Sequence, residues 1–152
     1  RSSDLTFDYS STDLIQFTGR AMRFENVNGD DILLYPGVAV IPRVDGAFAL
    51  IDIRELQISA EHRRFQEEDG VPKDTRIDGH TWAKTNKNGS PDRRFKDNYQ
   101  IPICIYGNIT FHSQTGLTEE YMVSNADAAQ AFAETVQRYQ TSLTESEALV
   151  QA

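Results

Sequence analysis

Residues 124–143, SNADAAQAFAETVQRYQTSL, decide the fold class of this chain. Ser124 and Asn125 can cap a helix, because their side-chain oxygens accept hydrogen bonds from N–H groups of the first turn. Apolar residues then recur at steps of three and four, which places them on one helical face. They are Ala129, Phe132, Val136, Tyr139 and Leu143. The pattern predicts an amphipathic helix from Asn125 to about Gln140.

The chain before this helix reads as short strands separated by turns. Pro36-Gly37, Asp45-Gly46 and Gly107-Asn108 carry the residue types that tight turns require. Residues 61–79 are charged and contain Gly70, Pro72 and Gly79, so they predict a long excursion without a strand. The predicted strands are 31–35, 38–41, 47–53, 56–60, 100–106, 109–113 and 117–123.

These elements predict a mainly β, α+β fold. About seven antiparallel strands would form a curved sheet or partly open barrel, capped by the C-terminal helix. A second helix near Thr12–Met22, capped by Ser11 or Thr12, would pack beside it. We expect a single domain over residues 1–152 with its core at about 28–140, and 141–152 as a tail or a link to a missing neighbour.

Composition excludes several classes of protein. Of the 152 residues, 39% are hydrophobic and 25% charged, as in an ordinary globular domain, and no apolar run approaches the ~20 residues of a membrane span. Cys104 is the single cysteine, so an internal disulfide is impossible and a reducing, cytoplasmic location is favoured. The net charge of −8 disfavours general binding of nucleic acid.

The charge is unevenly distributed, and this gives the candidate ligand-binding site. Residues 84–96 hold five cations against Asp92 alone, a local charge of +4 that leaves −12 for the remainder. Arginines can grip a phosphate or carboxylate, and aromatic rings can stack on a base. The candidate residues are Trp82, Lys84, Lys87, Arg93, Arg94 and Phe95. The alternative is structural: Arg93 and Arg94 would pair with the acidic run 67–69, while Trp82 and Phe95 fill the core.

Two stretches support a family resemblance. LYPGV (34–38) followed by FALIDIREL (48–56) resembles bacterial pleckstrin-homology-like (PH-like) and GRAM-like domains, in which an apolar strand runs through a polar step into the next strand. TW (81–82), NKNGSPDRRF (86–95) and QIPI (100–103) look similar to an uncharacterised bacterial family found inside larger proteins. The resemblance covers roughly residues 30–140, and the excursion at 61–79 departs from it. It implies the fold and a binding role, with ligands held by loops at the open end of the barrel.

No catalytic or metal site is predicted. His62, His80, His112 and Cys104 have no ligand spacing, and no nucleophile elbow or phosphate loop occurs. The sharpest enzymatic alternative is an HNH-type nuclease with His80 as general base and Asn88 as its orienter. That architecture requires a helix soon after the hairpin, whereas 100–106 alternates as a strand does.

The sequence therefore predicts a non-catalytic binding module, without cofactor, in a larger cytoplasmic bacterial protein. Its partner is expected to be a protein or a neighbouring domain. Recognition of phosphate or nucleic acid through the basic segment 82–96 is the main alternative.

Overall fold

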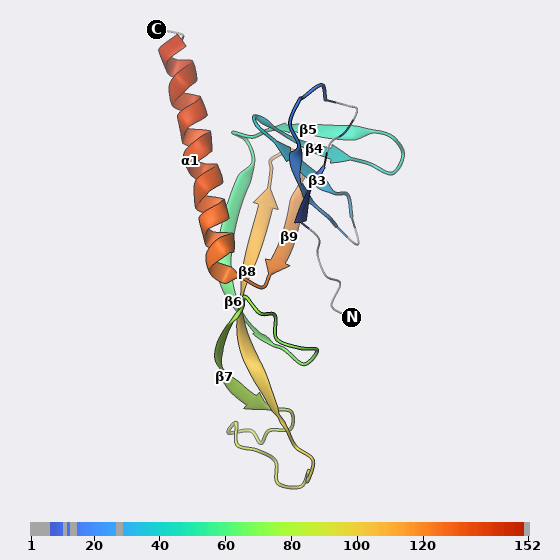
Figure 1. Ribbon diagram of the computed structural model, residues 1–152, viewed down its shortest axis with the longest axis vertical. Helices are drawn as coiled ribbons and strands as arrows, with labels where there is room; N and C mark the ends of the chain where they lie inside the picture. The colour runs from blue at the N-terminus through green and yellow to red at the C-terminus, as the bar shows by residue number, and fades with distance from the viewer. Residues whose placement is uncertain (1–6, 11, 13–14, 27–28, 151–152) are drawn as a thin grey trace. The chain divides into compact units, whose positions relative to one another are not determined.

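The structure is a computed structural model that describes residues 7–10, 12, 15–26 and 29–150. These residues form antiparallel strands and one long C-terminal helix (Figure 1), so the mainly β, α+β prediction is confirmed at this level. The elements are β1 (Phe7–Ser10), β2 (Ala21–Phe24), β3 (Ile32–Tyr35), β4 (Val38–Pro42), β5 (Phe48–Asp52), β6 (Gln57–Gln66), β7 (Arg76–Trp82), β8 (Gln100–His112), β9 (Thr118–Val123) and α1 (Ala126–Val150).

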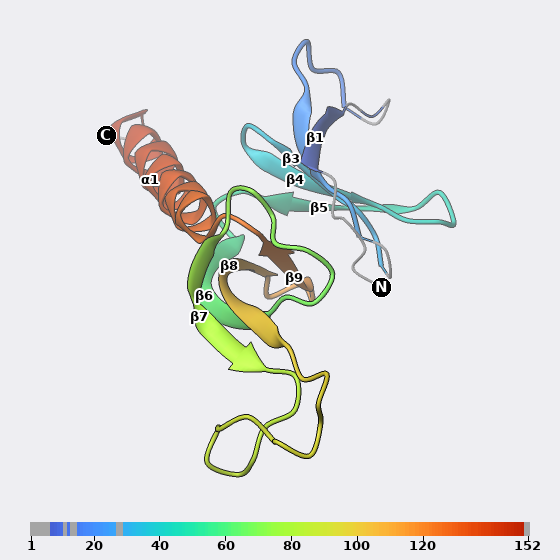
Figure 2. The ribbon, with the colours of Figure 1, turned by 60° about the horizontal axis from the view of Figure 1, so that its bottom comes forward.

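Nine strands are described, where seven were expected, and they make two sheets that do not close into a barrel. The first sheet has the order β1-β2-β3-β4-β5. The second has the order β6-β8-β7, and β9 also pairs with β8. Figure 2 shows β6, β7 and β8 side by side.

Backbone contacts divide the chain into two compact units. The first comprises Arg1–Ser59, Thr110–Tyr121 and Ala133–Ala152, and the second comprises Ala60–Ile109 and Met122–Phe132. We describe each unit by itself. The prediction of a single domain stays a prediction.

The hairpins of the first unit arise where the sequence predicts them. β3 and β4 are joined at Gly37, which has a φ of 89°, and β4 and β5 are joined at Gly46, which has a φ of 82°. Residues with a Cβ rarely adopt these left-handed conformations, so glycine terminates each strand there. These two turns and the strands beside them confirm the prediction for residues 31–53.

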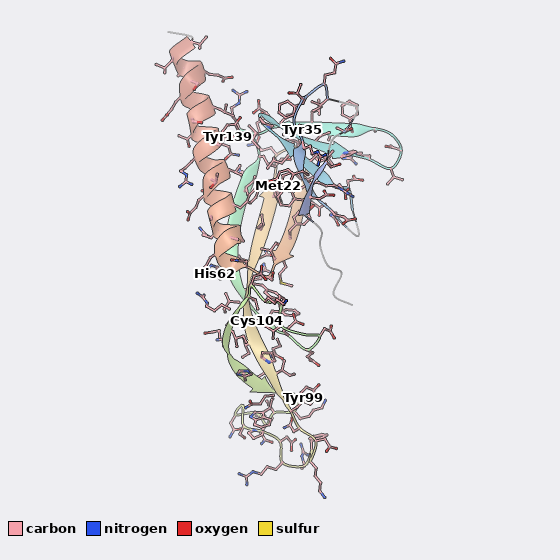
Figure 3. The ribbon with its side chains drawn as sticks, in the orientation of Figure 1. Met22, Tyr35, His62, Tyr99, Cys104 and Tyr139 are labelled. Atoms are coloured by element: carbon pink, nitrogen blue, oxygen red, sulfur yellow. The ribbon has the colours of Figure 1, made fainter. Side chains whose placement is uncertain are left out.

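Apolar side chains cover both faces of the five-stranded sheet. On one face Ala21, Leu33, Tyr35 and Val40 form a buried cluster; Figure 3 labels Tyr35. Phe24 lies on the other face, because side chains alternate along β2. Its ring packs against those of Phe111 and Tyr121, with centroids 4.8 and 5.4 Å away. The face of Phe24 therefore buries an aromatic cluster, which we define as Phe24, Phe111 and Tyr121.

No helix occurs among the described residues of the segment Thr12–Met22, so the prediction of an N-terminal helix is wrong. Residues 13 and 14 lie outside the described residues. Ala21 and Met22 instead belong to β2 and pair with Ser10 and Tyr9 of β1. Gly19 weakened the helical pattern from the start, and pairing with strands on both sides stabilises the extended form.

Helix α1 begins as expected but extends further. Asn125 Oδ1 accepts a hydrogen bond of 2.9 Å from Ala128 N, which is an N-cap. The helix then runs to Val150 rather than ending near Gln140. Its buried residues are Ala126, Ala129, Ala133 and Val136.

The buried stripe is therefore rotated relative to the predicted one. Tyr139 is 40% exposed, and position 140 faces inward in its place. Gln140 Nε2 donates to the backbone oxygens of Ile53 and Leu56 at 2.6 Å. The prediction relied on bulky apolar residues, whereas the buried face of the helix consists mainly of alanines and a glutamine that donates hydrogen bonds.

The predicted turn at Gly107-Asn108 does not exist. Both residues lie inside β8, which continues without a break from Gln100 to His112. A Cβ built on Gly107 would lie 2.4 Å from Ala129 Cβ and 3.1 Å from Ala126 Cα. The glycine is thus required by the close approach of α1 to the strand, which is the other common reason for glycine in a sheet.

The predicted excursion at 61–79 is shorter than expected. β6 continues into it as far as Gln66, β7 starts at Arg76, and residues 67–75 connect the two strands. Most side chains of both strands are exposed, so the apolar alternation that marks a half-buried strand is missing.

Within the described residues, α1 does not have the length of apolar sequence that crossing a lipid bilayer requires.

Candidate functional site

The candidate site is the connection between β7 and β8, residues 83–99, which we call the basic loop. Trp82, the last residue of β7, pairs with Gln100, the first residue of β8. Figure 1 shows the loop that joins β7 to β8. Ala83 N donates to Tyr99 O at 2.9 Å, which extends the pairing by one step into the loop. The two ends of the basic loop are therefore held by the sheet.

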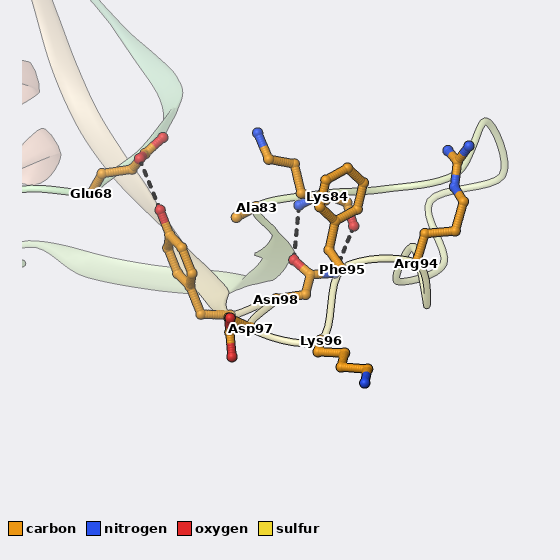
Figure 4. Close-up of a pocket in the computed structure, with 9 residues that line it drawn as sticks. Glu68, Ala83, Lys84, Arg94, Phe95, Lys96, Asp97 and Asn98 are labelled. Atoms are coloured by element: carbon orange, nitrogen blue, oxygen red, sulfur yellow. Dashed lines mark hydrogen bonds between the residues drawn. The ribbon is translucent and has the colours of Figure 1, made fainter.

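Asn98 ties the two sides of the basic loop together. Its Oδ1 accepts from Lys84 N at 2.9 Å, and its Nδ2 donates to Lys84 O at 2.8 Å (Figure 4). The side-chain amide thus serves as the partner of Lys84 N, and Lys84 O accepts from it as well as from Asp92 N at 2.9 Å.

A smaller hairpin forms the tip of the basic loop. Thr85 bridges to Pro91, Asn86 N donates to Ser90 O at 2.8 Å, and Gly89 takes a φ of 81°. Asn88 Oδ1 accepts from Ser90 N at 3.2 Å. The turn-forming residues that mark this segment as a loop therefore build a hydrogen-bonded structure.

Asp92 stabilises the part of the basic loop that follows the hairpin at its tip. It is 5% exposed, and its carboxylate accepts from Arg94 N at 3.0 Å and from Arg94 Nη2 at 2.6 Å. These bonds to Arg94 lower the pKa of Asp92 and raise the pKa of Arg94. Arg94 thus pairs with Asp92 rather than with the acidic residues 67–69.

The basic loop surrounds a hollow of about 370 Å³ (Figure 4). Phe95 and Tyr99 contribute aromatic rings to it, and these rings are 48% and 56% exposed. Lys84, Arg94 and Lys96 contribute positive charge, while Ala83, Asn98, Glu68 and Asp97 complete the lining. Lys84 Nζ lies 6.0 Å from the centroid of the Phe95 ring, within the range of a cation–π contact.

The structure brings together three of the six predicted residues. Lys84, Arg94 and Phe95 line the hollow, whereas Trp82, Lys87 and Arg93 do not. Phe95 is half-exposed, so it is not the core residue of the structural alternative. The sequence analysis did not predict Tyr99. Its aromatic ring, directly before the strand that starts at Gln100 and three residues after Lys96, was an available signal.

Tyr99 and Glu68 meet at the side of the hollow. The Tyr99 hydroxyl donates a hydrogen bond of 3.4 Å to Glu68 Oε2 (Figure 4). Figure 3 labels Tyr99 near the basic loop and Cys104 further along β8. At 3.4 Å this hydrogen bond is long and therefore weak.

The neighbouring acidic residue, Glu67, has a different partner. Tyr106 donates a hydrogen bond of 2.5 Å to Glu67 Oε2, and Phe65 stacks on the Tyr106 ring at 5.4 Å. Burial, assisted by this carboxylate, raises the pKa of Tyr106. Burial likewise raises the pKa of Cys104, a free thiol with no exposed surface. These groups lie outside the residues that line the hollow.

Among the residues that the structure describes, no three His, Cys, Asp or Glu side chains lie close enough to hold a metal ion. His80 is in β7, and Asn88 is at the tip of the basic loop, where it bonds to Ser90. The segment that follows the loop is strand β8.

Removing the Asn98 side chain should loosen the basic loop without unfolding the protein. We expect Asn98→Ala to cost about 1 kcal/mol of global stability at most, because the amide is exposed. Hydrogen exchange at the amide of Lys84 should accelerate about tenfold. Asn88→Ala, which removes a bond only at the tip, serves as the control and should leave the Lys84 amide unchanged. Equal exchange rates in the two variants would contradict the role assigned to Asn98.

No protein-family model, curated protein or solved structure matches this chain.

Proposed function

We propose that this protein is a non-catalytic binding module that recognises an acidic segment of a partner protein through the basic loop. The observation that carries this proposal is the hollow itself. It places two half-exposed aromatic rings and the ammonium groups of Lys84 and Lys96 on a hydrogen-bonded scaffold, and Arg94 also lines it but is paired with Asp92.

Aromatic residues and arginine are the residue types that dominate binding energy at protein interfaces. Phe95 and Tyr99 can accommodate apolar side chains, while Lys84 and Lys96 attract carboxylates. The chain as a whole has a net charge of −8, whereas residues 84–96 have a net charge of +4. This local positive charge favours acidic ligands over basic ones.

We further propose that the module belongs to a larger cytoplasmic bacterial protein and is PH-like. Support for the PH-like assignment is the resemblance of residues 34–38 and 48–56, together with antiparallel strands followed by a C-terminal helix. The single cysteine supports the reducing location.

Single-stranded nucleic acid is a second candidate ligand, because exposed aromatic rings beside cations also bind bases and phosphates. Glu68 and Asp97 on the lining work against it, since both repel phosphate. An acidic peptide can place an uncharged residue beside these two carboxylates, whereas every nucleotide of a single strand carries a phosphate.

The test is selection from a random peptide display library against the chain. We expect the selected peptides to be enriched in Asp and Glu, and their affinity to fall about tenfold or more in Phe95→Ala combined with Tyr99→Ala. Tyr9→Ala removes an exposed ring from β1 and is the matched control, with no effect expected. Peptides that bind the double variant equally well contradict the proposal. Binding of a single-stranded oligonucleotide in place of peptides would establish the second candidate.

A further inference from the structure

Strand β5 is an edge strand of the described part of the first sheet. It is the last strand of its sheet and pairs with β4 on one side, and no described strand pairs with it on the other. Ala47 O accepts from Arg43 N, and Ile53 N donates to Gly37 O, so the odd-numbered residues of this region bond towards β4. Because the direction alternates, the backbone N–H and C=O groups of Phe48 and Leu50 point away from the sheet.

This edge lacks the features that normally prevent pairing between molecules. Residues 46–51 carry no charge, and the side chains of Phe48 and Leu50 are 45% and 56% exposed. By contrast, β6 carries charged residues along its length, and β7 has an irregular register between Ile77 and His80, next to Gly79. Charges and irregularities of this kind are how natural sheets block edge pairing.

We propose that β5 pairs antiparallel with β5 of a second copy of this chain, with the two-fold axis at Ala49. In this register Phe48 of each copy faces Leu50 of the other. Each donates a backbone hydrogen bond to the other and accepts one in return, so the outward groups of both residues are satisfied. The facing phenylalanine and leucine side chains make an aromatic–aliphatic cross-strand pair on one face.

The neighbouring register is less favourable. An axis at Leu50 would place Phe48 opposite Asp52 of the second copy. The Asp52 carbonyl already accepts a hydrogen bond from Glu55 N at 2.9 Å, and its carboxylate would face an apolar ring. The axis at Ala49, unlike the axis at Leu50, uses the outward backbone groups of Phe48 and Leu50 without disturbing this turn.

Electrostatics also favour this edge as the place where two copies meet. Two chains of net charge −8 repel one another, so a contact between them requires a segment without exposed carboxylates. Residues 46–51 form such a segment, because none of them is charged. At its end, Arg54 Nε donates to Asp52 Oδ1 at 2.8 Å and lowers the pKa of Asp52 to about 2, and Asp52 would face Gly46 of the second copy.

The first test measures mass in solution by sedimentation equilibrium. We expect a concentration-dependent dimer with twice the 17.2 kDa mass of the chain. Leu50→Lys should raise the dissociation constant of this dimer at least about tenfold, because two lysines then flank the paired edge. Val44→Lys adds the same charge on the adjacent turn, where Val44 is fully exposed, and should change the constant little. A chain that stays monomeric at all concentrations, or a dimer unaffected by Leu50→Lys, overturns the proposal.

The second test determines the register and does not depend on the first. Facing residues at a non-hydrogen-bonded position have Cα atoms about 4.5 Å apart, a distance that a disulfide can span. Ala49→Cys should therefore form a covalent dimer under mild oxidation, whereas Leu50→Cys should not. Cys104 is buried and should not interfere. Cross-linking through Leu50→Cys, or none through Ala49→Cys, overturns the register.

Discussion

Replacing Phe111 with alanine should lower the free energy of unfolding by about 3–5 kcal/mol, the cost of deleting a fully buried phenyl ring. Phe111 has no exposed surface, and its ring contacts Phe24 and Tyr121 at centroid distances of 4.8 and 5.6 Å. The vacated space cannot be filled by small shifts, because strands β2, β8 and β9 all contribute to the aromatic cluster. Since typical domains are stable by only 5–15 kcal/mol, the loss would be a large fraction of the total.

Urea denaturation followed by circular dichroism measures this loss. Phe111→Leu keeps most of the volume and should cost less than about 1.5 kcal/mol. Phe95→Ala is the matched control, because it deletes the same side chain from an exposed position and should change stability by about 0.5 kcal/mol or less. Equal losses in Phe111→Ala and Phe95→Ala would show that the cluster does not form the core described above.

Adding a single methyl group at Gly107 should also destabilise the protein, by about 1–3 kcal/mol. The new Cβ of Gly107→Ala would lie 2.4 Å from Ala129 Cβ, so either β8 or α1 would have to move. The Ala126 backbone is the next obstacle, with its Cα at 3.1 Å, and it cannot rotate away as a flexible side chain could.

A compensating substitution tests the cause of this loss. Ala129→Gly costs about 1 kcal/mol by itself, because glycine is a poor helix former. Combined with Gly107→Ala, it removes the closest contact, so the double variant should lose less than the sum of the two single losses. Ala128→Gly lies on the exposed side of the same helical turn and should give no compensation. Additive losses in the Ala129 pair would contradict a direct clash.

The sequence correctly predicted those parts of the fold in which a residue type has a single structural explanation, such as glycine in a tight turn. Gly37 and Gly46 take positive φ angles in turns, and the strands around them follow. Gly107 shows the limit of this reasoning, because glycine also serves where a helix lies close to a strand. Only the three-dimensional contact distinguishes the two meanings. The same contact explains why small alanines, not the larger apolar residues, form the inner stripe of α1.

The segment that forms the candidate site was predictable from the sequence, but the set of residues that line it was not. Local composition identified the segment, and Lys84, Arg94 and Phe95 do line the hollow. Asp92 limits how Arg94 can bind a ligand, because the guanidinium of Arg94 forms an ion pair with the Asp92 carboxylate within the loop. A partner two residues away in the sequence was overlooked in favour of the acidic run at 67–69. Pairing of charges depends on turn geometry, which residue types alone do not specify.

The division of the chain has a consequence for how this protein can be dissected. Its backbone passes between the two compact units four times, at residues 59–60, 109–110, 121–122 and 132–133. Every passage falls inside a strand or the helix, never in a connecting loop. Neither unit is therefore a contiguous piece of the chain, and a truncation or proteolytic cut made to isolate one of them would have to pass through a strand or through the helix.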